Sequence, residues 1–76
     1  MASNGTKRLL GTIRDVKFER GFAWVDGDNG KRYFLHVHNL KGEVWTKEFI
    51  VYGTRVEFTP DETNRGPRAI NAQLIS

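Results

Sequence analysis

Two short segments that alternate aromatic with small or aliphatic residues constrain the fold of this chain most strongly. Residues 20–25 read Arg-Gly-Phe-Ala-Trp-Val, and residues 33–37 read Tyr-Phe-Leu-His-Val. Side chains of a β-strand alternate between its two faces, so each segment offers one aromatic face and one face suited to a core. Asn29-Gly30 between them is a strong β-hairpin signal, because both residues can adopt positive φ. If the two strands pair, one surface carries Phe22, Trp24, Phe34 and His36.

Further short apolar segments are separated by turn signals at the spacing of a small barrel or sandwich. We expect a bend or bulge at Gly11, an end to the fourth strand at Pro60, and regular alternation through 69–74. Five strands and no helical pattern predict an all-β fold, a five-stranded antiparallel barrel of the oligonucleotide- and oligosaccharide-binding (OB) type. The expected strands are residues 9–18, 22–26, 31–38, 54–59 and a last strand after the turn at 65–67.

The length of 76 residues allows one small domain. We expect a flexible polar tail over 1–8, a folded domain over 9–76, and within it a long loop over about 39–51. The chain has no cysteine and no apolar run long enough to cross a bilayer or to serve as a signal peptide. These features predict a cytoplasmic protein that does not associate with membranes.

The charge balance favours a polyanionic partner. Twelve Lys+Arg against nine Asp+Glu give a formal net charge of +3. Exposed rings on a basic sheet suit single-stranded RNA or DNA, because every base has a π-face on which to stack. We therefore predict that Phe22, Trp24, Phe34 and His36 stack bases. The candidate cations for the phosphate backbone are Arg14, Lys17, Arg20 and, beside a late turn, Arg65.

Catalysis and metal binding have little support in the sequence. His36 and His38 lie two residues apart, but no cysteine completes a zinc site. The serines, Ser3 and Ser76, stand at the chain ends, where no base or oxyanion site can be built around them. The sequence predicts a binding protein that is not an enzyme and that needs no metal or other cofactor.

Several motifs in register resemble the cold-shock domain over about residues 10–75. They are the glycine-led start at 11–14, the basic-aromatic segment 20–25, the Phe-Leu-His of 34–36, and the closing pattern that extends from Val56 to Asn71. The resemblance implies a five-stranded barrel that binds single-stranded RNA or DNA without catalysis. It also implies a role as an RNA chaperone or a regulator of gene expression.

The chain departs from the family pattern on the binding face. Asp15-Val16 stands where family members usually carry Trp-Phe, and Val37 stands where an aromatic residue is typical. Missing rings and an added carboxylate predict weakened binding to single strands. Phe18 and Trp45 are candidate replacements for the missing rings.

A function of another class is the alternative. With its aromatic face reduced, the domain would serve as a protein-interaction module or an inhibitor that keeps only the fold. The contact patch would then be Trp45, Phe49, Ile50 and Val51, in the loop over 39–51. The competing explanation for these apolar residues is structural, namely that they close the open end of the barrel.

Overall fold

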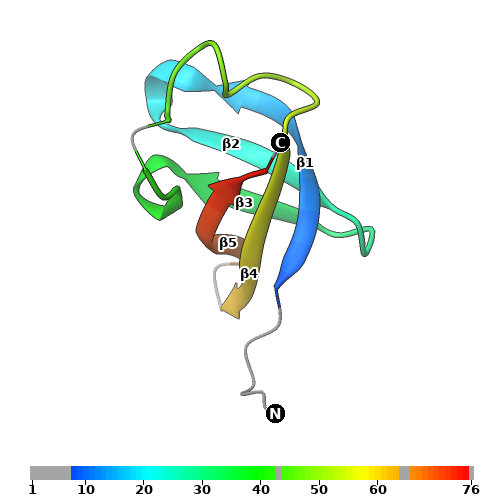
Figure 1. Cartoon of the computed structure of the whole chain (residues 1–76). Helices are drawn as coiled ribbons and strands as arrows, with labels where there is room; N and C mark the ends of the chain where they lie inside the picture. Colours follow the sequence, from blue (N-terminus) through cyan, green and yellow to red (C-terminus); the bar gives the residue numbers. More distant parts are fainter. Residues whose placement is uncertain (1–7, 43, 64–65, 76) are drawn as a thin grey trace.

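The computed structural model describes residues 8–42, 44–63 and 66–75, and within them the chain forms a closed barrel (Figure 1). Its order around the barrel is β1-β2-β3-β5-β4. Directions cannot alternate around a closed ring with an odd number of strands. One neighbouring pair, β3 and β5, is accordingly parallel, so the predicted all-β, five-stranded barrel is confirmed with that one exception. The elements are β1 (Leu9–Lys17), η1 (Phe18–Arg20), β2 (Phe22–Gly27), β3 (Arg32–His36), η2 (Val37–Asn39), β4 (Arg55–Thr63) and β5 (Gly66–Leu74).

The core consists of the inward side chains predicted by the alternation in β2 and β3, joined by residues of the other strands. Tyr33 is the largest of its fully buried side chains, with its ring centroid 5.0 Å from that of Phe58. The Tyr33 hydroxyl is not left unsatisfied, because Asn29 Nδ2 donates a hydrogen bond to it at 3.0 Å. The fully buried core residues are Ile13, Ala23, Val25, Tyr33, Leu35, Val56, Phe58, Ala69 and Ala72. Because these residues fill the interior, the alternate residues of β2 and β3 face outward.

We had predicted a bend or bulge at Gly11, but the irregularity in β1 lies at Arg14. Gly11 pairs regularly, and a Cβ built on it would lie only 2.6 Å from Val25 Cγ1, so glycine is required there by close packing. The register shifts between Ile13 and Asp15, which leaves Arg14 as the extra residue of a bulge. This bulge changes the alternation and turns Asp15 toward the face that carries the aromatic residues.

The β2–β3 hairpin forms as predicted, but its turn differs in detail. The Gly30 amide donates to the Gly27 carbonyl at 2.9 Å, and Gly30 has a φ of 89°. Of the two residues that can adopt positive φ, only Gly30 does so, and Asn29 does not. The third strand is also shorter than expected, because β3 ends at His36 and His38 belongs to η2.

Two further predictions about strands are wrong because pairing overrides local signals. Pro60 lies inside β4, beyond the last residue paired with β1, Phe58, and an unpaired strand edge tolerates the missing N–H. In β5, Asn71 adopts a φ of 49° opposite a register shift. Ala69 and Ala72 are therefore both buried, which interrupts the predicted alternation.

Two segments outside the strands make further contacts with the barrel. Arg8, which we had assigned to a flexible tail, donates hydrogen bonds to Thr59 Oγ1 at 3.0 Å and to the Asn71 carbonyl at 2.8 Å. At the opposite end, the connection between η2 and β4 folds over the barrel, and Ile50 enters the core at 2% exposure (Figure 1). Within the described residues, no helix is long and apolar enough to cross a membrane.

Candidate nucleic-acid interface

The outward side chains form rows that cross neighbouring strands. At the centre of the sheet, Trp24 of β2 is paired with Phe34 of β3. The row continues to Asp15 of β1 on one side and to Arg68 of β5 on the other. We call these four residues the central row. It carries a carboxylate at its β1 end, a guanidinium group at its β5 end and two rings between them.

The predicted stacking residues lie together as one surface, which we call the aromatic platform: Phe22, Trp24, Phe34 and His36. The Phe34 ring centroid lies 5.0 Å from that of Phe22 and 5.4 Å from that of Trp24. His36 is paired with Phe22 across β2 and β3, and its ring lies 6.3 Å from Phe34. All four side chains are partly exposed. The arrangement leaves ring surface open to solvent, as stacking requires.

His36 is oriented by a contact with the turn that follows it. Its Nδ1 accepts a hydrogen bond from the His38 backbone N–H at 3.1 Å. The His38 ring lies 4.7 Å from the His36 ring. No cluster of three or more metal-ligating side chains occurs in the described part of the chain. His36 is thus placed as an outward ring at the edge of the platform.

Phe18 and Trp45 come together in a second aromatic cluster beside η1. Their rings stack with centroids 5.9 Å apart and an interplanar angle of 14°, and Trp45 Nε1 donates to the Phe18 carbonyl at 3.3 Å. Lys47 Nζ lies 5.6 Å from the Phe18 ring centroid. Both rings also pack against the core and are only partly exposed. The structure therefore places Trp45 on Phe18 and not among the rings of the aromatic platform.

The predicted cations differ in how far their charge is already engaged. Arg14 forms an ion pair with Asp26 at 3.3 Å and lies over the Tyr52 ring. Lys17 forms an ion pair with Asp15 at 3.6 Å. Arg20 is exposed, and no ion pair to it is found within the described residues.

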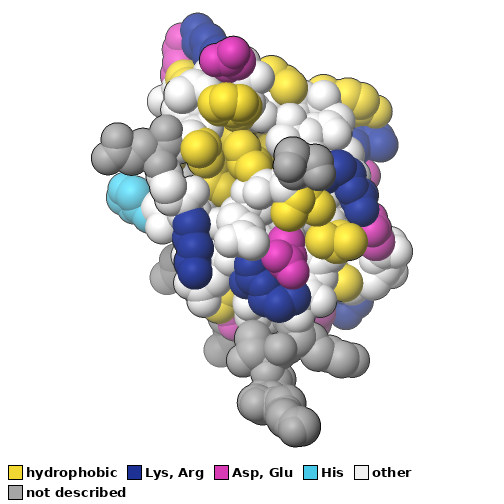
Figure 2. Space-filling model, viewed as in Figure 1, with side chains coloured by type: hydrophobic (Ala, Val, Ile, Leu, Met, Phe, Trp, Pro, Cys, Tyr) yellow, Lys and Arg dark blue, Asp and Glu magenta, His cyan; other side chains and the backbone are white. Residues whose placement is uncertain are grey.

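Such pairing extends beyond the predicted cations. The fourth predicted cation, Arg65, lies outside the described residues. Figure 2, a view onto β4 and β5, shows Lys and Arg side chains beside Asp and Glu. Much of the positive charge is therefore balanced locally, which reduces the charge available for phosphate groups.

One pocket at the edge of the platform brings two further arginine residues, Arg32 and Arg68, to the rings of Trp24 and Phe34. Its volume is about 440 Å³, and it is lined by Trp24, Arg32, Phe34, Gly66, Pro67 and Arg68. Arg32 is placed there by its pairing with Asp26 in the β2–β3 hairpin, which a hairpin register could have indicated. Arg68 is placed there by the parallel pairing of β3 with β5, for which the sequence carries no local signal.

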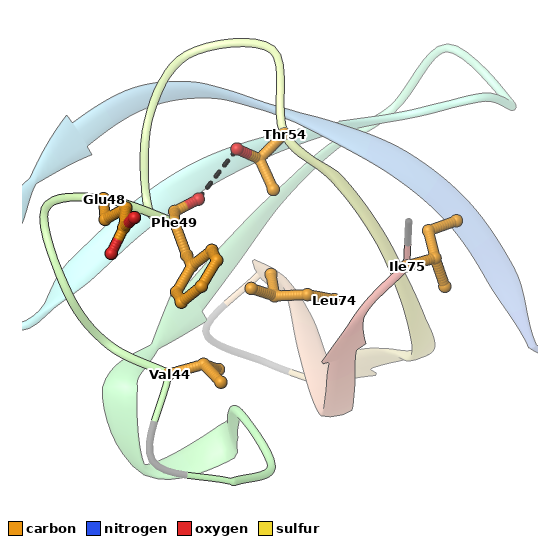
Figure 3. A pocket seen from close by; sticks show the side chains of 6 residues that line it. All are labelled: Val44, Glu48, Phe49, Thr54, Leu74 and Ile75. Carbon is orange, nitrogen blue, oxygen red and sulfur yellow. Dashed lines mark hydrogen bonds between the residues drawn. The ribbon is translucent and has the colours of Figure 1, made fainter.

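A second pocket lies at the end of the barrel, under the connection that precedes β4. It has a volume of about 380 Å³, and in Figure 3 the side chains of Val44, Phe49 and Leu74 point toward one another across it. Thr54 Oγ1 donates to the Phe49 carbonyl at 2.8 Å and fixes the loop there (Figure 3). Phe49 and Val51 remain 48% and 43% exposed. Of the four residues in the predicted contact patch, only Ile50 is buried in the core at the end of the barrel.

Comparison with known proteins finds relatives along most of the chain. The major cold shock protein of Streptococcus pyogenes is 30% identical over 66 residues, which cover 87% of this chain and 96% of the relative. The cold shock-like protein CspLB of Listeria monocytogenes is 32% identical over 59 residues, or 78% of this chain and 86% of the relative. No protein-family model matches.

A solved structure, described as "drosophila Unr CSD456", is similar with a TM-score of 0.76 and 26% sequence identity. The match covers 95% of this chain and 28% of that longer chain. The barrel, the motifs in register and a relative matched over nearly its whole length agree with one another. The chain belongs to the cold-shock protein family.

Proposed function

We propose that the protein binds single-stranded RNA or DNA by stacking bases on the aromatic platform, without catalysis. The observation that carries this proposal is the continuous set of partly exposed rings on β2 and β3, with centroids 5.0 to 6.4 Å apart among Phe22, Trp24 and Phe34. Unpaired bases expose the faces that such rings contact, and each stacked base contributes roughly 1 to 3 kcal/mol. Duplex bases are already stacked and bind poorly.

The phosphate backbone is expected to follow the rim of the platform. Lys17 is paired with Phe22 across β1 and β2, and Arg20 is exposed in η1 nearby. Lys17 must exchange its contact with Asp15 for a phosphate group, which reduces its net contribution. We expect affinity in the micromolar range or weaker and a shallow dependence on salt, at about −0.7 in log-log slope per phosphate contact. In the cell, such binding supports a role as a cytoplasmic RNA chaperone or regulator of gene expression.

The test compares platform variants with a matched control. Trp24→Ala and Phe34→Ala should each weaken binding to a short pyrimidine-rich single strand by roughly 1 to 3 kcal/mol, because each removes a stacking ring. Phe49→Ala removes an exposed ring at the end of the barrel and should leave affinity unchanged. Affinity is measured by fluorescence anisotropy, with thermal melts to verify folding. Equal affinity of the wild type and both platform variants would contradict stacking on this surface.

Binding of a partner protein is the second candidate function. It is favoured by the exposed side chains of Phe49, Val51 and Tyr52 near the apolar pocket at the end of the barrel. Exposed apolar clusters are typical of contact surfaces between proteins. If the wild type binds no single-stranded oligonucleotide at any salt concentration, this candidate replaces the first.

A further inference from the structure

The pocket beside the central row combines aromatic ring surface with side chains that can only donate hydrogen bonds. Trp24 and Phe34 supply the rings, and Arg32 and Arg68 supply two guanidinium groups. The indole N–H of Trp24 is also only a donor. The side chains that line the pocket therefore offer donors and no acceptors. Its volume of about 440 Å³ lies within the usual range for small-molecule sites, roughly 300 to 1,000 Å³.

Both guanidinium groups are oriented by carboxylates in ways that leave donors available. Arg32 contacts Asp26 through Nε, which lies 3.3 Å from Asp26 Oδ1. Its two terminal nitrogens have no partner among the described residues. Arg68 contacts Asp61 through Nη2 at 3.2 Å, and no partner for its Nη1 is found among the described residues. A guanidinium group held at one position is pre-organised to bind with the rest of its fork.

The chemistry of the bases decides what such a pocket selects. Guanine presents two adjacent acceptors, O6 and N7, on its Hoogsteen edge, and an arginine fork binds this pair with two hydrogen bonds. Adenine presents an amino donor next to N7, and cytosine presents an amino donor, so each would direct a donor at a guanidinium group. A base stacked on Trp24 or Phe34 brings its edge toward the arginine residues that line the same pocket.

We propose that this pocket is a guanine-selective subsite, in which Arg32 and Arg68 recognise the O6/N7 edge of a base stacked on the platform. The inference rests on the proposed function and adds a base preference to it. Neither arginine is needed for stacking itself, so selectivity and affinity are separable. A single guanine in an otherwise pyrimidine strand should be held at this position.

The test uses fluorescein-labelled oligothymidines of one length that carry a central guanine, adenine or 7-deazaguanine. The last base keeps O6 and the Watson–Crick edge but lacks the N7 acceptor. We expect guanine to bind roughly 5- to 150-fold more tightly than adenine, the range for one bidentate pair, and 7-deazaguanine to lose part of this advantage. Arg32→Gln and Arg68→Gln should each reduce the preference for guanine.

A matched control separates recognition from general charge. Lys31→Gln removes one positive charge from the residue next to Arg32, and Lys31 pairs with Glu62 without lining the pocket. This variant should weaken the binding of all three oligonucleotides equally and keep the preference for guanine. Thermal melts verify that each variant is folded.

The possible results distinguish the two proposals. Equal binding of all three oligonucleotides by the wild type would overturn the guanine subsite and leave stacking on the platform intact. A preference that persists in both arginine variants would overturn the assignment of Arg32 and Arg68. Absence of binding to every oligonucleotide would overturn the proposed function, and the subsite with it.

Discussion

Substitution of Asp15 provides the most direct test of how this chain differs from its relatives. Asp15 is paired with Trp24 at the β1 end of the central row, and its carboxylate lies 3.6 Å from Lys17 Nζ. Arg14 and Arg32 do not compete for this carboxylate, because both contact Asp26. If the protein binds a single strand as proposed, we expect the carboxylate to have two effects, because it repels phosphate groups and forms an ion pair with Lys17 on the same face.

The magnitude follows from these contacts. Asp15→Asn removes the charge and releases Lys17, and an exposed ion pair of this kind is worth about 0.2 to 1 kcal/mol, or about 1.4- to 5-fold in affinity. If Lys17 then contacts one phosphate group, the log-log salt slope should steepen by about 0.7. Asp15→Trp adds a ring beside Trp24, and a further stacked base would contribute roughly 1 to 3 kcal/mol, or about 5- to 150-fold.

The assay is fluorescence anisotropy with a short pyrimidine-rich single strand at two salt concentrations. Glu57→Gln is the matched control, because it changes the net charge equally on β4, which borders neither β2 nor β3. Thermal melts establish that the variants are folded. If both Asp15 variants bind no better than the wild type, or if Glu57→Gln gives the same gain, the argument from the central row is refuted.

Two further predictions concern the stability of the barrel. The Arg55 guanidinium, which hydrogen-bonds to Asp28, lowers the pKa of that carboxyl below its ordinary value of 3.8. The stabilisation from this pair is thus present above about pH 3.8 and is lost as the pH falls through the lower pKa that Asp28 has in the folded protein. The melting temperature of Asp28→Asn should therefore fall less on acidification than that of the wild type. Phe58→Ala removes a fully buried ring and should destabilise the protein by about 3 to 5 kcal/mol in urea unfolding, whereas Phe49→Ala should change stability by about 0.5 kcal/mol or less. A large loss from Phe49→Ala would show that the loop contributes more to the barrel than its exposure indicates.

The parts of the fold that depend on local alternation could be predicted from the sequence. The inward positions of Ala23 and Leu35 and the outward positions of Trp24 and Phe34 follow from a period of two residues within a hairpin. The errors arose where pairing between distant strands decides the outcome. Pro60 remains in β4 because that stretch lacks a second partner, a fact that no local pattern contains.

The candidate site divides in the same way. The Trp24–Phe34 contact lies within one hairpin and was predictable, since their strands are adjacent in sequence. Arg68 reaches Phe34 only through the parallel pairing of β3 with β5, so its place in the site could not be read from its own neighbourhood. Trp45 lies in a loop without periodicity, and its stacking on Phe18 depends on how that loop folds back.

The core and the binding face can change independently in this barrel, and this independence explains how the chain keeps the fold with an altered surface. Asp15 is more than half exposed, so replacing a ring there leaves the buried set of the barrel untouched. The consequence is a central row with a negative charge at the β1 end and a positive charge at the β5 end. Under the proposed function, we expect a polyanionic strand to avoid the Asp15 carboxylate until Lys17 exchanges it for a phosphate group. The other end of the row, where Asp61 holds one nitrogen of Arg68, is where we expect direct contact with the edge of a base.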